Sequence, residues 1–174
     1  MQFNLNHPDR GLRDIFQDVR FRRAMSLAIN RDEVNDIAYF GQGVSRQLTV
    51  VPSSRYFEPE FARAYADYDT AAANRLLDEI GLIDVDGDGM REGTDGEPLS
   101  MTLEYVLGET PKQETVELVT AHWREVGVQV NRRLISGSLQ ATRCSAGLMD
   151  MTIWHGDRNA DILFPIEPFW YVPM

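Results

Sequence analysis

Residues 100–154 alternate between short runs with the period of a β-strand and longer stretches with the spacing of an amphipathic helix. The strand-like runs are 101–105, 128–135 and 149–154, and the helical stretches between them are 110–126 and 136–146. Thr110 is expected to cap the first of these helices, with Pro111 at its first position, and Ser136 is expected to open the second. Because crossovers of this length join parallel strands, the pattern predicts a strand–helix–strand–helix–strand unit with right-handed connections.

The first half of the chain indicates helices instead. Asp18 is a candidate cap for a helix with apolar residues at spacings of three and four, and Asn30 is a second candidate cap. Glu33 follows Asn30 by three residues, which completes a capping-box pattern. Asp69 should cap a third helix, and alternation around residues 3–5 suggests a short opening strand. The expected fold class is therefore α/β, with a mainly parallel sheet in the second half and a helical first half packed around it.

Bulk composition limits the functional classes that this chain can belong to. Its 174 residues are 43% hydrophobic and 25% charged, which suits one domain with its own core. The net charge of −10 and the pI of about 4.7 argue against a nucleic-acid partner, because a phosphate backbone would be repelled. No apolar stretch approaches the roughly 20 residues that span a bilayer. Cys144 is the single cysteine and is interpreted as a small packed side chain.

Polar residues follow each predicted strand, and these strand ends should meet at one edge of the sheet. Ligands of open parallel sheets gather at the carboxyl ends of the strands. Trp154 offers an apolar ring that could stack on a sugar or a peptide side chain, although packing in the core explains it equally well. Asp157 could accept a hydrogen bond from an amine or hydroxyl group. The candidate ligand-binding residues are Glu109, Ser136, Trp154, His155, Gly156 and Asp157.

Motifs of common enzymes are absent from the sequence. There is no G-x-S-x-G nucleophile elbow, no dinucleotide-binding fingerprint and no phosphate-binding loop of the Walker type. The three histidines, His7, His122 and His155, are far apart and lack zinc-binding spacing, and His122 is interpreted as structural. One enzymatic alternative stays open, a hydrolase in which His155 and Asp157 act as an acid–base pair.

The stretch "DVDGDGMREGTD" (84–95) nearly matches the calcium loop of an EF-hand. Asp84, Asp86 and Asp88 occupy the first, third and fifth positions, and Gly89 occupies the sixth. Asp95 stands at the twelfth position, where a longer glutamate normally gives bidentate ligation. Clusters of Asp and Gly also form ordinary turns, so a metal-free hairpin is the default expectation and calcium is the only cofactor considered.

Six segments, in order and with matching spacing, resemble the extracellular solute-binding proteins of peptide-type ABC importers. They are "DVRFRRAMSLAINRDEV" (18–34), "YFGQG" (39–43), "YDTAAANRLLDEIGL" (68–82), "DVDGDGMREGTDGEPLSMTLEY" (84–105), "AHWREVGVQV" (121–130) and "MDMTIWHGD" (149–157). The resemblance implies a periplasmic-binding-protein-like lobe. Residues 1–174 would form a single domain, most of lobe II of a two-lobed protein, with "FNLN" (3–6) as the strand that crosses from the first lobe. The first lobe, the returning C-terminal segment and the signal peptide would lie outside this chain.

The same resemblance implies a function and a location. The protein would capture an oligopeptide or oligosaccharide in the cleft between its lobes, outside the cytoplasm, and deliver it to a membrane-embedded ABC permease. In peptide-binding relatives an Asp after the "WHGD"-like segment receives the α-amino group of the ligand, and Asp157 is nearest to that position. In these relatives the Asp-rich segment is usually a hairpin without metal. The alternative from another class is the ligand-sensing domain of a transcriptional regulator.

Overall fold

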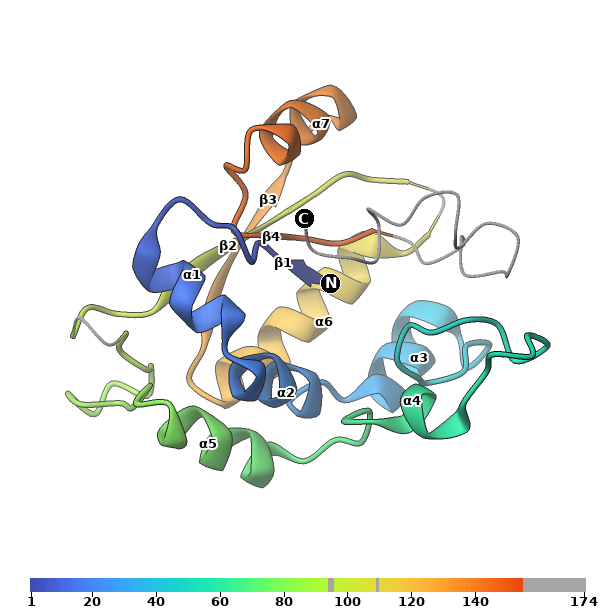
Figure 1. Cartoon of the computed structure of the whole chain (residues 1–174), viewed down its shortest axis with the longest axis horizontal. Helices are drawn as coiled ribbons and strands as arrows, with labels where there is room; N and C mark the ends of the chain where they lie inside the picture. Colours follow the sequence, from blue (N-terminus) through green and yellow to red (C-terminus); the bar gives the residue numbers. More distant parts are fainter. Residues whose placement is uncertain (94–95, 109, 155–174) are drawn as a thin grey trace.

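The computed structural model of the chain describes residues 1–93, 96–108 and 110–154, and its centre is a mixed β-sheet (Figure 1). Within these residues the sheet has four strands in the order β1-β4-β2-β3. Strand β2 pairs in parallel with both β3 and β4, while β1 pairs with β4 in the antiparallel sense. The parallel second-half sheet predicted from the sequence is therefore confirmed. The strands are β1 (Gln2–Phe3), β2 (Ser100–Tyr105), β3 (Gln129–Leu134) and β4 (Met151–Thr152).

Helices make up most of the first half and connect the strands of the second half (Figure 1). Three predicted N-caps are confirmed, because the side chains of Asp18, Asn30 and Asp69 each accept a backbone N–H from the first turn of the following helix. Ser136 caps its helix in the same way. The helices are α1 (Arg10–Gln17), α2 (Val19–Leu27), α3 (Arg31–Tyr39), α4 (Pro59–Arg63), α5 (Thr70–Glu79), α6 (Lys112–Glu125) and α7 (Gly137–Ser145).

The predicted start of α6 is wrong by one residue. Pro111, not Thr110, occupies the cap position, with a ψ of 61° that lies outside the helical range, and no side chain caps this end of the helix. The N–H of Lys112 donates to the carbonyl oxygen of Thr110 at 2.7 Å, so a tight turn replaces the expected hydroxyl cap. Among the residues that the structure describes, no side chain accepts a backbone N–H from the first turn of α6.

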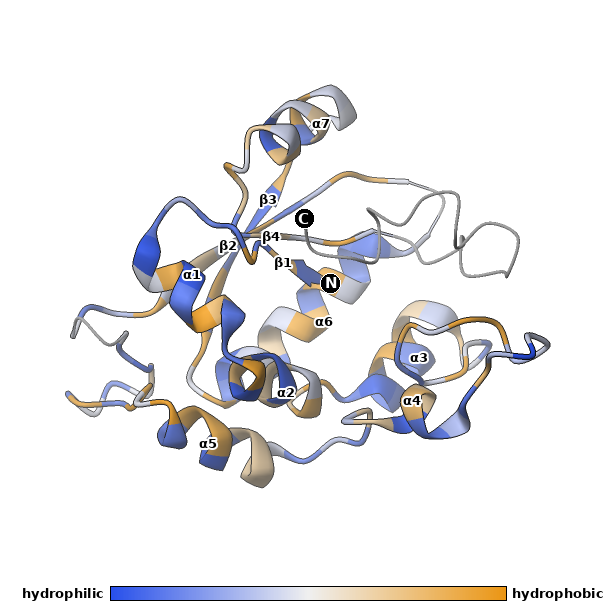
Figure 2. Cartoon of the chain, in the orientation of Figure 1, coloured by the Kyte–Doolittle hydropathy of each residue, from blue (hydrophilic) through white to orange (hydrophobic). Residues whose placement is uncertain are grey.

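One hydrophobic core joins the first-half helices to the sheet. Phe3 on β1 packs against Phe16 and Phe21, with ring centroids 5.3 Å away in both cases. Trp123 on α6 is 1% exposed, and its indole N–H donates to the carbonyl oxygen of Met25 on α2 at 2.8 Å. Figure 2 shows hydrophobic and hydrophilic stretches alternating along α5, as expected for a helix that buries one face, and Leu77 on that helix is fully buried. The two halves of the sequence thus stabilise each other.

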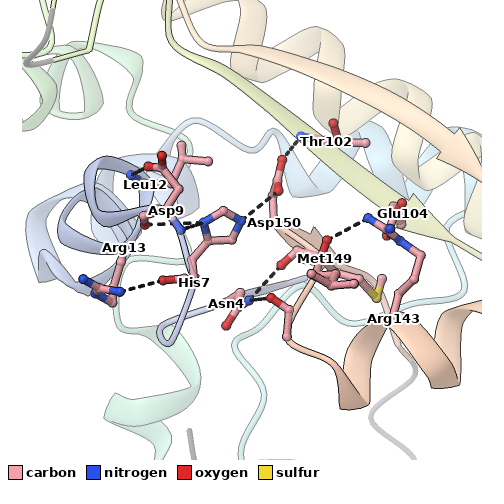
Figure 3. Close-up of polar contacts among 12 residues, drawn as sticks. Asn4, His7, Asp9, Leu12, Arg13, Thr102, Glu104, Arg143, Met149 and Asp150 are labelled. Carbon is pink, nitrogen blue, oxygen red and sulfur yellow. Dashed lines mark hydrogen bonds and ion pairs between the residues drawn. The ribbon is translucent and has the colours of Figure 1, made fainter.

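Polar contacts fix the opening segment of the chain against the start of β4 (Figure 3). The side-chain amide of Asn4 donates to the carbonyl oxygens of Gly147 and Met149, at 3.0 and 2.9 Å. Asp150 accepts from the ring of His7 at 3.1 Å through one carboxylate oxygen and from the backbone N–H of Thr102 at 2.7 Å through the other. This carboxylate therefore ties the opening segment, β4 and β2 together at the amino ends of the parallel strands.

The chain enters β1 and leaves β4 at the opposite edge, where the parallel strands end. Gln2 pairs with Thr152 and Phe3 with Met151, so residue 1 lies beside the residues that follow β4. In Figure 1 the N-terminus, the end of β4 and the start of α6 all lie on the right-hand side of the sheet. Among the described residues, no helix combines the length and apolar character needed to cross a membrane.

Candidate binding edge of the sheet

The carboxyl ends of β2, β3 and β4 lie together, as the sequence predicts. Tyr105 at the end of β2 accepts a hydrogen bond from the N–H of Ile135, just beyond β3, at 2.9 Å. On the other side, Glu104 of β2 pairs in register with Thr152 of β4. The segments that leave these strands therefore emerge side by side, and we call this the binding edge: residues 106–108, 110–112, 135–138 and 153–154.

Trp154 and Lys112 are in contact on the binding edge. Trp154 follows the end of β4 and is partly exposed. The ammonium of Lys112, in the first turn of α6, lies 4.7 Å from the centroid of the Trp154 ring, within the range of a cation–π interaction. Lys112 is only 6% exposed. The stacking role of Trp154 on a ligand stays a prediction, and the contact shows that its ring attracts a cation.

Sequence reasoning did not single out Lys112. The sequence did contain a signal for this residue. Lys112 is a cation at the start of the helix that follows a predicted strand, which is where ligands of parallel sheets gather. Lys112 is also the only lysine among the 174 residues, in which the other 16 cationic side chains are arginine. Periodicity could not distinguish it from a surface residue, since only the packing of α6 onto the sheet shows that it is buried.

Ser136 lies on the same edge but has a local structural task. Its hydroxyl accepts the N–H of Leu139 at 3.3 Å and lies 3.2 Å from the hydroxyl of Ser138. It follows β3, two strands away from β4, which corresponds to about 10 Å at the usual spacing between strands. Ser136 is therefore exposed on the binding edge without touching the pair formed by Lys112 and Trp154.

Several predicted site residues lie outside the described residues. These are Glu109, His155, Gly156 and Asp157 on the predicted ligand-binding list, and Asp95 in the Asp-rich loop. Their roles, and the acid–base pair of His155 and Asp157, stay predictions. The remaining predicted residues at the strand ends, Ser136 and Trp154, are placed as described above.

The Asp-rich loop brings its first three carboxylates together. Asp84, Asp86 and Asp88 each offer an oxygen within a cluster whose members lie within 4.8 Å of one another, and the fourth member is Glu92, which the sequence pattern did not include. Backbone N–H groups already occupy these carboxylates: Asp84 accepts from Gly87 and Gly89 at 2.7 and 2.9 Å. Asp86 and Asp88 each accept the N–H two residues on, at 3.0 and 2.7 Å, and these are contacts of Asx turns, which form without metal.

The loop also lies away from the binding edge. It precedes β2, and the N–H of Arg91 donates to the carbonyl oxygen of Gly127, just before β3, at 2.8 Å. Both positions are at the amino ends of the parallel strands. An ion held by this loop would therefore stabilise the hairpin and would not touch a ligand at the carboxyl ends. The metal-free hairpin stays the prediction, and calcium stays the alternative, with the carboxylates of the loop as its candidate ligands.

The pKa values of two groups are shifted by contacts that hold the first-half helices. Hydrogen bonds from the side chain of Arg20 hold the pKa of Asp18 below its usual range, and the carboxylate is then a charged cap for α2. Burial lowers the pKa of Arg31, whose guanidinium donates to the carbonyl oxygens of Ser26 and Ala66 at 2.9 and 3.0 Å. Both groups are structural, and neither lies on the binding edge.

The family model, the curated relatives and the solved structures that match this chain all indicate the same protein family. Residues 1–171 match the family described as bacterial extracellular solute-binding proteins, family 5. A probable ABC transporter-binding protein of Deinococcus radiodurans is 29% identical over 163 residues, which are 94% of this chain and 26% of that protein. A solved oligopeptide-binding protein OppA is 40% identical with a TM-score of 0.91, covering 98% of this chain and 26% of that one.

A periplasmic oligopeptide-binding protein of Thermotoga maritima, solved with mannohexaose bound, is also similar. It is 26% identical with a TM-score of 0.71, and the match covers 86% of this chain and 28% of that chain. The chain thus spans about a quarter of the length of the relatives that it matches.

Proposed function

This chain belongs to the bacterial extracellular solute-binding proteins of family 5, and on that premise we propose that it forms most of one lobe of a two-lobed binding component of an ABC importer. The protein would capture an oligopeptide or an oligosaccharide in the cleft between its lobes. Residues 1–174 would correspond to most of lobe II, with the first lobe supplied by the rest of the protein. The full-length protein would act outside the cytoplasm, with a membrane-embedded ABC permease as its partner.

The arrangement of the binding edge carries this proposal. The backbone enters β1 and leaves β4 at the edge where β2, β3 and β4 end, because β1 is antiparallel to its neighbour. A chain that crosses to another lobe at this point would place the binding edge against that lobe. Closure of two lobes about a few crossing segments is a hinge motion, and it would bury a ligand that contacts the edge.

The binding edge suits either class of ligand. The aromatic face of Trp154 offers an apolar surface with a polar N–H, which fits a sugar ring as well as a peptide side chain. The names of the relatives favour peptides, while one of their structures holds mannohexaose. Family members are solute-binding proteins, and we infer that this chain likewise binds without turning over its ligand.

A binding screen of the full-length protein tests the proposal. Thermal-shift measurements with unblocked di- to pentapeptides and with neutral oligosaccharides should identify a ligand that raises the melting temperature, and calorimetry should then give its affinity. Replacing Trp154 by alanine should weaken that binding by about fivefold or more, because an aromatic contact contributes roughly 1 kcal/mol beyond area burial.

Val85→Ala is the control, since Val85 is 70% exposed on the Asp-rich loop at the other end of the strands. Its affinity should equal that of the unmodified protein. Hydrolysis of the ligand during the titration would refute a purely binding function. Unchanged affinity of the Trp154→Ala protein would show that the ligand does not use the binding edge.

A further inference from the structure

Residues 40–65, which we call the α3–α4 segment, display apolar side chains that the fold itself does not use. The segment runs from the end of α3 through α4, and the structure describes all of it. None of its residues belongs to the hydrophobic core or packs against that core. Its exposed large apolar side chains are Phe40, Val44, Leu48, Tyr56, Phe61 and Tyr65, of which the first two are 81% and 82% exposed. Exposed apolar side chains gathered in one segment are typical of an interaction surface.

The backbone of the α3–α4 segment is strained at both of its ends. Phe40 and Tyr65, with φ of 54° and 53°, are the only described residues other than glycine that have a positive φ. This conformation is unfavourable for a bulky side chain, and such strain tends to occur at functional sites. Hydrogen bonds hold the segment in place of apolar packing. The backbone N–H of Gln47 donates to the carbonyl oxygen of Ala62 at 2.8 Å, and its side-chain amide donates to those of Ala64 and Tyr65 at 2.9 and 3.1 Å.

The charge of the segment differs from that of the rest of the chain. It holds the three arginines Arg46, Arg55 and Arg63 and two glutamates, which gives a net charge of +1 within a chain of −10. By contrast, residues 84–97 hold six acidic residues and one arginine. In Figure 1 the helices α3 and α4 lie on the right-hand side of the molecule, and the Asp-rich loop that follows α5 lies on the left-hand side. An anionic surface would therefore repel the two sides to different extents and orient the protein.

Arginine side chains lie over two of the exposed rings. The guanidinium carbon of Arg55 is 4.6 Å from the centroid of the Tyr56 ring, and that of Arg23 on α2 is 4.6 Å from the centroid of the Tyr65 ring. Rings next to cations suit the boundary between lipid headgroups and acyl chains, where the apolar part enters the boundary and the cation meets phosphate groups. Protein interfaces also favour Tyr and Arg, but the charge contrast along this molecule favours an anionic surface.

We propose that the α3–α4 segment docks this protein onto an anionic lipid surface. Phe40 and Val44 would enter the boundary of the acyl chains, and Arg55 and Arg63 would meet lipid phosphates. The inference goes beyond the proposed function, because ligand capture needs no contact with lipid. The end of β4 and the start of α6 lie on the same side of the molecule as α3 and α4 (Figure 1), so docking would also turn the binding edge toward the membrane.

Vesicles of two compositions test the contact with lipid. The full-length protein is sedimented with vesicles of phosphatidylcholine alone and with vesicles of an equal mixture of phosphatidylcholine and phosphatidylglycerol. At low salt we expect about fivefold tighter binding to the mixture, the ratio for one net positive charge at the lipid surface. High salt should remove this difference by screening and leave the apolar contribution. Absence of binding to both kinds of vesicle, or equal affinity for both at low salt, would overturn the proposal.

A double variant tests the apolar contribution. Phe40→Asn combined with Val44→Ser removes the two most exposed apolar side chains of the segment, and asparagine tolerates the left-handed backbone of residue 40. We expect about tenfold or weaker binding to both kinds of vesicle, the ratio for one large side chain that is no longer buried. Ile83→Asn combined with Val85→Ser is the matched control on the acidic side, where these residues are 47% and 70% exposed. Equal affinities of the two double variants would refute the assigned surface.

A second double variant tests the charge. Arg55→Gln combined with Arg63→Gln should abolish the preference for phosphatidylglycerol and leave the affinity for phosphatidylcholine unchanged, because both cations are exposed on the segment. Arg124→Gln combined with Arg132→Gln removes two exposed cations from α6 and β3 and is the control. The same loss of preference in both double variants would indicate an effect of total charge and contradict local docking.

Hydrogen exchange gives a readout that does not depend on variants. Phosphatidylglycerol-containing vesicles should slow exchange within residues 40–65 of the full-length protein and leave residues 80–93 unchanged. Slowed exchange in residues 80–93 alone would overturn the assigned orientation. Binding to native membrane vesicles but not to protein-free lipid would indicate a protein partner and overturn lipid docking. A protein that binds peptides or oligosaccharides but no vesicles would refute this inference and leave the solute-binding function standing.

Discussion

Replacing Asp150 by alanine should loosen the start of β2 and β4 by a predictable amount. Its side chain is the only acceptor shown for two donors that come from distant parts of the described chain. The N–H of Asp9 donates to one ring nitrogen of His7 at 3.1 Å, so the other ring nitrogen carries a proton and donates to Asp150. The second carboxylate oxygen accepts the N–H of Thr102 at 2.7 Å (Figure 3).

The free energy follows from these two contacts. Hydrogen bonds to a charged group contribute about 1.5–3 kcal/mol each. The side chains of Asp150 and His7 are 21% and 9% exposed, so water replaces only part of what is lost. We therefore take the lower end of the range and expect Asp150→Ala to destabilise this region by about 3 kcal/mol. Asp150→Asn should cost less, because its carbonyl oxygen can still accept the N–H of Thr102.

Hydrogen exchange followed by mass spectrometry measures this effect locally. A loss of about 3 kcal/mol should speed exchange of the Thr102 amide by roughly 100-fold if it exchanges through local opening. Asp14→Ala is the matched control, because Asp14 is a carboxylate that is 63% exposed and meets only the exposed side chain of Arg10 at 3.6 Å. Unchanged exchange at Thr102 in the Asp150→Ala protein would refute the reasoning that this carboxylate holds the strands together.

Three further predictions concern stability away from the binding edge. Arg91→Met should lower the free energy of unfolding by about 3 kcal/mol in urea titrations, because two buried carbonyl oxygens, those of Leu82 and Val126, lose their donor. Wild-type stability of this variant would contradict that role. Asp18 has a pKa lowered chiefly by the hydrogen bond from Arg20, so its contribution is present above the unfolded-state pKa and is lost as the pH falls through the folded-state pKa. Asp18→Ala should therefore cost about 1 kcal/mol at neutral pH, with a smaller difference from the unmodified protein below about pH 4. Calcium should leave the melting temperature unchanged relative to EDTA, and a rise that Asp86→Asn abolishes would establish an ion site in the loop.

The burial and the partners of charged residues are the features of the structure that the sequence pattern predicts least well. Glu104 occupies an exposed-looking position in an alternating strand, yet it is 1% exposed between Arg133 and Arg143. Similarly, the sequence indicates a structural role for His122, which is buried, but its partner Glu33, 2.8 Å away, stands 89 residues earlier. Periodicity assigns a residue to a face of its own element and carries no information about which charges lie across from it.

The sequence by itself determined the local features of this protein. Asp18, Asn30, Asp69 and Ser136 cap helices as predicted, because a cap needs only the backbone two or three residues away. The alternation of strands and helices likewise determined the parallel pairing of the second-half sheet, since a helical crossover leaves few other topologies.

Only the tertiary structure decided which distant residues meet. The pair of Lys112 and Trp154, the contact of His7 with Asp150 across 143 positions, and the place of Glu92 among the aspartates all depend on how helices and strands pack. Such contacts form because burying apolar surface in one shared core brings the elements together, and the polar groups at their ends are then fixed wherever that packing leaves them.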